Sequence, residues 1–357
     1  MFFPMDPDRT PHPFTLALLH WYASHQRQMP WRQTRDPYAV WLSEVILQQT
    51  RVQQGWAYYE RFMECFPTVE TLAAATEDEV LRQWQGLGYY SRARHLHAAA
   101  RQVVAAGRFP DTAEGWRKLS GVGPYTAAAI ASFAFDQSCA ALDGNAFRVL
   151  ARHFGISLPI GSSEGRQTFE TLAEELLPAD RSRDFNLAIM DFGSLQCTPS
   201  SPNCGSCPLA ESCIACREGR TGELPVRGRK TTVHTRRLAY VYLRHQGFTA
   251  LRQRPAGDIY AKLWEPLDGA SASEAGWSGG GLLARGVKHQ LTHLTIIADF
   301  YLWEPAVRPA LPPDYQWIAE CDLPHYALPR LIEKLIALLQ PAPLQLPPLG
   351  GRVNTSL

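Results

Sequence analysis

The feature that most constrains this chain is a cluster of cysteines past its midpoint. Five of the eight cysteines fall within residues 197–216, in the stretch CTPSSPNCGSCPLAESCIAC, and the other three are scattered. In a reducing compartment, thiols concentrated in so short a segment indicate metal ligation rather than disulfides. We therefore expect a loop that closes around an inorganic centre.

The spacing of these cysteines favours one set of ligands. Cys197, Cys204, Cys207 and Cys213 form C-x6-C-x2-C-x5-C, and four thiolates can hold a tetrahedral zinc ion or a [4Fe-4S] cluster. Zinc sites usually carry two C-x2-C pairs, so the staggered spacing favours the iron–sulfur cluster. Zinc stays open, because Cys213 and Cys216 form a second C-x2-C pair.

The pattern of apolar and polar residues changes after residue 218 of the 357-residue chain, which predicts two domains. Residues up to 218 contain amphipathic helical segments separated by Gly- and Pro-bearing turns. Residues 219–235 are polar and basic, as in a linker. Alternating strand-like segments and a final amphipathic helix follow. We expect a helical domain over 1–218, a smaller α+β domain over 236–342 and a disordered tail over 343–357.

Composition excludes several classes of protein. The chain is 45% hydrophobic and 19% charged, as in a soluble globular protein, and no stretch approaches the roughly 20 apolar residues of a membrane span. Its formal net charge is only +1, so a nucleic-acid surface must come from local clustering. The N-terminal segment lacks the pattern of a signal peptide. We expect a cytoplasmic enzyme with no membrane partner.

An acidic residue stands on an apolar helix face in the segment EVILQQT. Counting by three and four from Val40 and Trp41 reaches Glu44, where an unpaired carboxylate is costly to bury. A glutamate at the edge of the stripe, paired with an arginine or reaching solvent, is the ordinary explanation. A carboxyl group held in its protonated form is the functional alternative.

Two further motifs stand at the starts of predicted helices. In LSGVGPYT, residues 119–126, Gly121 and Gly123 flank Val122, which predicts a tight turn between helices with amides at a helix N-terminus, suited to a phosphate. In ALDGN, Asp143 follows an apolar run at the start of the next helix. A helix cap is one role for Asp143, and capping can coexist with catalysis.

Several motifs in order resemble one known family. PWR at 30–32, EVILQQT, GLGYYSRARHLH at 86–97, LSGVGPYT, LDGN and the cysteine spacing resemble the MutY-type adenine DNA glycosylases of the endonuclease III superfamily. The match is strong over residues 14–218 and looser beyond. The resemblance implies an all-α helix-hairpin-helix domain with an iron–sulfur loop at 197–213, followed by a smaller α+β Nudix-like domain.

The resemblance implies a reaction and roles for its residues. The family hydrolyses adenine from duplex DNA where it is mispaired with 8-oxoguanine or guanine, and we expect a monomer acting on chromosomal DNA. Glu44 is then the protonated acid and Asp143 the ionised stabiliser of the sugar cation. Tyr125 replaces the lysine of strand-cleaving relatives, so lyase activity should be weak or absent. Tyr125 and Asn145 would position the sugar and Asp143.

Other positions match DNA-contacting residues of the family. Gln49 and Tyr89 would wedge into the duplex, while Trp31 and Arg32 would line the adenine pocket. Leu187 departs from the family, where relatives often carry Gln or Glu. In the second domain, a loop that usually reads Phe-Ser-His to recognise oxidised guanine corresponds here to Leu291, Thr292 and His293.

Three rival functions stay open on the sequence. The first is an endonuclease III-like glycosylase/lyase, against which Tyr125 argues. The second is a catalytically idle protein that scans damaged DNA, against which the presence of both Glu44 and Asp143 argues. The third is a Nudix nucleotide hydrolase, whose glutamate-rich signature is missing from SASEAGWSGGGLLARGV.

Overall fold

The computed structural model describes residues 10–226, 228, 232–291 and 293–339, and it divides into two compact units. Unit 1 covers Met1–Lys230 and unit 2 covers Thr231–Leu357. Within the described residues, no helix is both long and apolar enough to cross a membrane. The expected tail at 343–357 lies outside the described residues.

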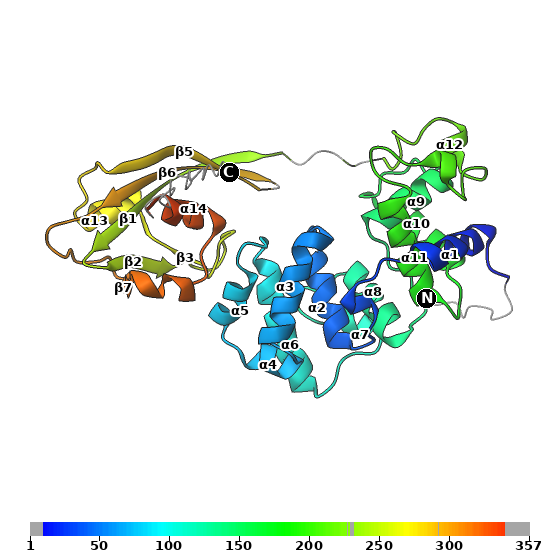
Figure 1. Ribbon diagram of the computed structural model, residues 1–357, viewed down its shortest axis with the longest axis horizontal. Helices are drawn as coiled ribbons and strands as arrows, with labels where there is room; N and C mark the ends of the chain where they lie inside the picture. The colour runs from blue at the N-terminus through cyan, green and yellow to red at the C-terminus, as the bar shows by residue number, and fades with distance from the viewer. Residues whose placement is uncertain (1–9, 227, 229–231, 292, 340–357) are drawn as a thin grey trace, which may run out of the picture. The chain divides into compact units, whose positions relative to one another are not determined.

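Unit 1 is helical throughout its described part, as predicted (Figure 1). Its α-helices run in the order α1 (Pro13–His25), α2 (Pro37–Leu47), α3 (Val52–Cys65), α4 (Val69–Ala74), α5 (Glu77–Trp84), α6 (Ser91–Ala106), α7 (Ala113–Arg117), α8 (Pro124–Phe135), α9 (Gly144–His153), α10 (Ser163–Leu176), α11 (Ser182–Leu195) and α12 (Ile214–Arg217). Short 3-10 turns at Pro30–Arg32 and Cys204–Ser206 complete the unit.

Local capping explains where these helices begin. Thr76 and Glu79 form the reciprocal hydrogen bonds of a capping box at the start of α5. Asp36 caps α2 by accepting from two backbone amides, and Pro37 occupies its first turn. The apolar faces then meet in a core that includes the fully buried Trp41 and Trp116, whose ring centroids lie 5.6 Å apart.

The predicted hairpin lies between α7 and α8, and its two glycines serve different purposes. Gly121 adopts a left-handed φ of 72°, and a Cβ there would lie 2.4 Å from the Cβ of His95 on α6. Gly123 is the N-cap of α8, with an extended backbone and open space where a Cβ would be. Val122 is buried between them. The turn therefore brings backbone to the surface at the start of α8.

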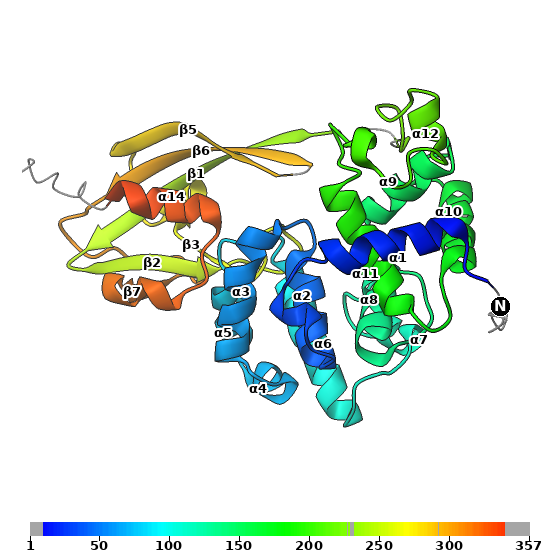
Figure 2. The ribbon, with the colours of Figure 1, turned by 45° about the vertical axis from the view of Figure 1, so that its right-hand side comes forward.

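Unit 2 combines strands with a few helices (Figure 2). Its elements are, in chain order, β1 (His234–His245), β2 (Phe248–Gln253), β3 (Trp264–Glu265), β4 (Leu267–Asp268), α13 (Gly269–Glu274), β5 (Leu282–Gln290), β6 (Leu294–Trp303), β7 (Gln316–Ala319), the 3-10 turn Glu320–His325 and α14 (Arg330–Leu339).

The strands form a seven-stranded sheet with the order β3-β2-β1-β6-β5, and β4 and β7 join it by pairing with β1 and β2. Strands β1 and β6 run parallel, and the other pairs are antiparallel. A core that includes Val241, Leu243 and Ala272 packs α13 against the sheet.

The expected linker over 219–235 differs from the structure at both ends. Leu224 is only 2% exposed, and its carbonyl accepts a hydrogen bond from Arg152 on α9. Strand β1 already begins at His234. The first residues of the expected linker therefore pack on unit 1, because the buried Arg152 needs hydrogen-bond acceptors and the Leu224 carbonyl is one of them. Composition alone does not reveal such a contact.

Candidate active site

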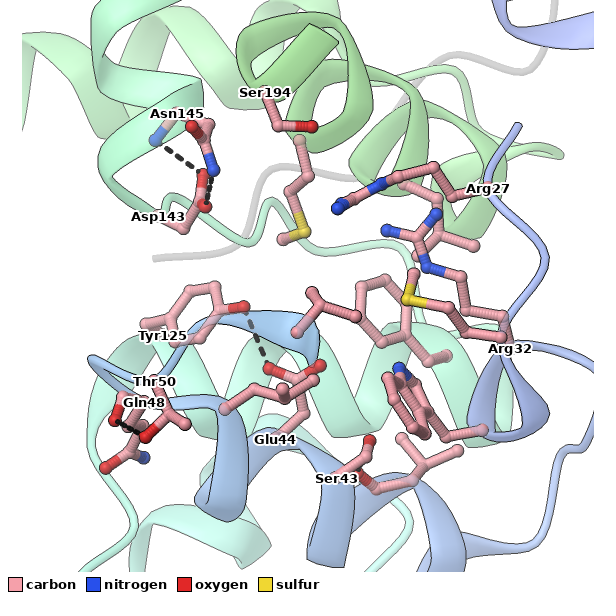
Figure 3. A pocket seen from close by; sticks show the side chains of 18 of the residues that line it. Arg27, Arg32, Ser43, Glu44, Gln48, Thr50, Tyr125, Asp143, Asn145 and Ser194 are labelled. Atoms are coloured by element: carbon pink, nitrogen blue, oxygen red, sulfur yellow. Dashed lines mark hydrogen bonds between the residues drawn. The ribbon is translucent and has the colours of Figure 1, made fainter. Parts of the chain in front are cut away.

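A cavity of about 590 Å³ in unit 1 collects most of the residues expected to do chemistry. This volume lies in the range of small-molecule sites. Glu44 and Tyr125 line one wall, while Asp143 and Asn145 face them from the other (Figure 3). Residues about a hundred positions apart in the chain thus share one space, as the catalytic interpretation requires.

Glu44 lies near the end of α2, on the same face as the buried Val40 and Trp41. Burial raises the pKa of Glu44 from an ordinary 4.5 to about 7, against the lowering effects of Tyr125 and Arg32. The Tyr125 hydroxyl donates to Glu44 Oε2 at 2.8 Å. Because Oε2 accepts this bond, a proton on Glu44 belongs on Oε1. A pKa of about 7 lets this carboxyl group donate a proton at neutral pH.

Asp143 is both a helix cap and a residue of the cavity. Its Oδ1 accepts from the backbone amides of Asn145 and Ala146 at 2.9 and 2.8 Å, and its Oδ2 accepts from Asn145 Nδ2 at 2.7 Å. These bonds favour the ionised form, as expected. Burial nevertheless raises the pKa of Asp143 overall, so burial opposes the ionised form more strongly than these hydrogen bonds favour it.

Two residues were not predicted from the sequence, namely Arg27, which lines the cavity, and Asp191, which binds Arg27 from behind the wall. Asp191 on α11 is completely buried and accepts from Arg27 Nε at 2.5 Å and from Arg32 Nη1 at 2.6 Å. Both arginines line the cavity (Figure 3). Asp191 stands in the apolar segment FNLAIMDFG, so the argument that singled out Glu44 would also have found it.

Both residues predicted to contact adenine line the cavity. Trp31 and Arg32 line the cavity from the turn before α2, and Trp31 is 5% exposed. Leu187 on α11 also lines it and is equally buried. An aliphatic side chain therefore occupies this part of the wall, and it offers no hydrogen bond to a base.

The two predicted wedge residues share an unusual backbone conformation. Gln49 has a φ of 57° and Tyr89 a φ of 49°, both in the left-handed region that non-glycine residues rarely adopt. Gln49 lines the mouth of the cavity, and the Tyr89 side chain is 48% exposed. Strain of this kind gathers at functional sites.

The cysteine loop fits an iron–sulfur cluster. Cys197, Cys204, Cys207, Cys213 and Cys216 all line one small cavity. Burial, then the neighbouring thiols, raises the pKa of Cys213, which places the groups within electrostatic reach of one another. A cavity walled by thiols is the arrangement that a cluster with several cysteine ligands requires.

Arg148 connects this loop to the cavity. Its guanidinium donates to Asn145 Oδ1 at 2.7 Å and to the carbonyl oxygen of Cys197 at 2.8 Å. A Cβ at Gly193 would lie 2.6 Å from that of Asn145, so only glycine lets α11 approach α9 this closely. Arg148 therefore binds both the cysteine loop and Asn145, whose side chain donates to Asp143.

The predicted lesion-reading residues lie at a hairpin in unit 2. Leu291 N donates to Leu294 O at 2.8 Å, which closes the turn between β5 and β6. Leu291 is half-buried and His293 is exposed, and the carbonyl of His293 accepts from the amide of His234 on β1. Thr292 lies outside the described residues.

Comparison with known proteins matches three parts of the chain. Residues 42–176 match the HhH-GPD superfamily of base excision DNA repair proteins. Residues 197–213 match the iron-sulfur binding domain of endonuclease III, and residues 239–338 match the NUDIX domain. The matched loop runs from Cys197 to Cys213 and supports one [4Fe-4S] cluster in this chain.

Relatives of known activity settle the family. An adenine DNA glycosylase of Buchnera aphidicola from Schizaphis graminum is 33% identical over 254 residues, covering 70% of this chain and 73% of the relative. The chain belongs to the adenine DNA glycosylase family. The rat adenine DNA glycosylase is 44% identical over 226 residues, covering 59% of this chain and 44% of the relative. The match thus spans less than half of the mammalian protein.

Solved structures agree with the fold of this family. A thermostable thymine-DNA glycosylase aligns with a TM-score of 0.54 at 32% identity, over 57% of this chain and 95% of that one. Endonuclease III in a non-covalent DNA complex aligns with a TM-score of 0.51 at 22% identity, over 58% and 94%. The helix-hairpin-helix fold followed by a Nudix-like unit is therefore confirmed, as is the expected family.

Proposed function

We propose that this protein is a monofunctional adenine DNA glycosylase that hydrolyses the bond between adenine and deoxyribose in duplex DNA. The observation that carries the proposal is the pairing of Glu44 and Asp143 across one cavity large enough for a base. Family membership supports the same reaction. The partner strand would carry 8-oxoguanine or guanine opposite the adenine, and the protein would act as a monomer.

Glu44 supplies the proton that makes adenine a leaving group. The bond from C1′ to the base breaks with its electron pair going to adenine, and the proton on Glu44 Oε1 neutralises the departing ring. Burial keeps that proton available near neutral pH. Tyr125 stays protonated, because burial raises its pKa well above the usual 10, so it donates to Glu44. A phenol carries no amine, so Tyr125 cannot form an imine with the sugar.

Asp143 stabilises the positive sugar that remains. Its carboxylate is oriented by Asn145, which Arg148 holds in turn. Water then adds to C1′ and gives up a proton to the Glu44 carboxylate, which restores the acid and leaves an abasic site and an intact strand. Cys197, Cys204, Cys207 and Cys213 would hold the [4Fe-4S] cluster. The cluster would brace the loop whose Cys197 carbonyl accepts from Arg148.

The remaining predicted contacts divide between DNA opening and lesion reading. Gln49 and Tyr89 would fill the gap left by the flipped adenine, which offsets lost stacking. The amides around Gly121 and Gly123 would bind a phosphate. In unit 2, Leu291 and His293 would contact the base opposite.

The test is a single-turnover assay on duplexes with A:8-oxoguanine and A:G, analysed with and without alkali. We expect strand breaks only after alkali, because base removal without lyase action leaves the backbone intact. Breaks without alkali would indicate a glycosylase/lyase instead. Glu44→Gln should lower the rate by roughly a hundredfold or more while duplex binding persists. A variant with normal turnover would remove Glu44 from its assigned role.

A further inference from the structure

One arginine outside the cavity contacts both segments that carry the wedge residues. Arg92 lies on the first turn of α6, three residues after Tyr89. Its Nη1 donates to the carbonyl of Gln48 at 2.5 Å, and its Nη2 to the carbonyl of Gly88 at 3.4 Å. These two carbonyls immediately precede the left-handed Gln49 and Tyr89. The guanidinium therefore binds the peptide group entering each strained residue.

The same guanidinium completes the end of α2. Nη1 also donates to the carbonyls of Val45 and Ile46 at 3.0 and 3.2 Å. Gln48 follows the last residue of α2 with a non-helical backbone, and the terminal carbonyls of a helix need partners of this kind. The hydrogen bonds of Arg92 in the described residues come from its two terminal nitrogens and all go to carbonyl oxygens, while its buried Nε has no partner there.

Surrounding contacts hold Arg92 in place. Its guanidinium carbon lies 5.1 Å from the ring centroid of Trp84 and 5.3 Å from that of Tyr89. The Trp84 indole also donates to the carbonyl of Gly88 at 2.8 Å. Gln48 in turn donates to Thr126 Oγ1 on α8, next to Tyr125. A chain of hydrogen bonds thus runs from the Tyr89 loop through Arg92 to the helix that carries Tyr125.

We propose that Arg92 is a positioning residue that fixes Gln49 and Tyr89 together in the conformation that enters the duplex. It touches neither base nor sugar, and it acts by fixing the two peptide groups. The proposal rests on the proposed function, since it assigns a step in flipping adenine. Without the guanidinium, both left-handed residues would relax toward ordinary backbone angles, and an adenine would have to leave the stack without a wedge.

The test compares Arg92→Met with Arg92→Lys and with the control Arg101→Met. Arg101 is an exposed arginine on the same helix whose guanidinium donates to the carbonyls of Ala73 and Ala75 at 3.3 and 3.5 Å, away from Gln49 and Tyr89. Single-turnover rates are measured on two duplexes. One has the target adenine in a normal stack, and the other has an abasic spacer beside it, so that stacking is already weakened. A 2-aminopurine next to the adenine reports flipping by its fluorescence.

We expect Arg92→Met to slow release from the stacked duplex by roughly tenfold to hundredfold, since flipping costs a few kcal/mol without support. On the weakened duplex the loss should shrink to within about threefold. Arg92→Lys should fall between, because one ammonium cannot fork to both carbonyls. Arg101→Met should match the wild type.

Equal losses on both duplexes, or no loss on either, would overturn the role of Arg92. A thermal melt identifies a variant that fails to fold. If Arg92→Met fails in this way, the rates of Arg92→Lys on the two duplexes test the role of Arg92. If the wild type releases adenine from neither duplex, the proposed function fails instead. The fluorescence change, which requires flipping alone, still decides for or against Arg92 in that case.

Discussion

Glu44 shows how burial gives one carboxyl group a different chemistry from the others. Its ordinary pKa of 4.5 rises to about 7 because the folded state removes water from it. The folded protein thus binds this proton more tightly than the unfolded chain. The stability that Glu44 contributes is fully present below pH 4.5 and is lost as the pH rises through about 7.

This linkage predicts that Glu44→Gln stabilises the protein in alkali while it abolishes activity. The glutamine mimics the neutral form, so the variant avoids the cost of ionising a buried group. That cost is about 3 kcal/mol for a pKa moving from 4.5 to about 7, as an upper bound. Urea unfolding at pH 5 and pH 8.5 measures it, and the variant should gain stability at the higher pH.

The exposed Glu64 on α3 is a matched control for this experiment. Glu64→Gln should change the free energy of unfolding little at either pH, because its charge stays in water. If Glu44→Gln gains nothing between pH 5 and pH 8.5, the carboxyl group ionises freely and is a poor acid for the proposed reaction.

Single residues were predictable where chemistry conflicted with their surroundings. Glu44 was found because an acid stands on an apolar stripe, and Tyr125 because it occupies the place of a lysine in relatives. Arg92 was not found, because its partners are carbonyl oxygens, which carry no mark in a sequence. The left-handed backbone of Gln49 and Tyr89 was equally invisible, since it depends on contacts made elsewhere in the fold.

At the scale of elements, the cysteine loop and α9 behave as one assembly. Arg148 joins Asn145 to the carbonyl of Cys197, so the loop must hold its shape for Asn145 to hold Asp143. We predict that Cys204→Ser removes the brown visible absorbance of the cluster and lowers adenine release. Absorbance near 400 nm together with iron analysis provides the measurement.

Cys65→Ser is the control, because this exposed thiol lies on α3, outside the cysteine loop. It should keep both the colour and the activity. Zinc in place of iron in the wild-type protein would contradict the cluster. A colourless Cys204→Ser variant with full activity would contradict the link from the loop to Asp143.

The elements themselves followed closely from the sequence. The capping box at Thr76, the cap at Asp143 and the turn after β1 all have local causes that a sequence displays. The close approach of α9 and α11 does not, because it depends on the missing side chain of Gly193 meeting Asn145. Glycine in a helix has several possible reasons, and only the packing identifies this one.

At the scale of the whole molecule, the two units have separate cores, and we propose separate tasks for them. Unit 1 contains every residue of the proposed chemistry, while unit 2 contains Leu291 and His293. We predict that a chain ending at residue 226 still releases adenine but loses most of its preference for A:8-oxoguanine over A:G. The ratio of single-turnover rates on the two duplexes measures this preference.

Circular dichroism of the shortened chain provides the control, since a folded unit 1 should retain its helical signal and its melt. An unchanged preference would place lesion reading in unit 1 and leave unit 2 without its proposed role. The division into two domains was visible in the sequence as a change from helical to strand-like patterns of apolar residues. Its exact position was not, because Leu224 is buried by contacts from α9.

Arg152 binds both the cysteine loop and the backbone near the end of unit 1. Its guanidinium donates to the carbonyls of Thr198 and Pro199 in the cysteine loop as well as to that of Leu224. Leu224, near the end of unit 1, is therefore held to the cysteine loop by a single side chain. We expect loss of the metal to free Leu224 together with the loop, so that this part of the chain becomes accessible to proteases.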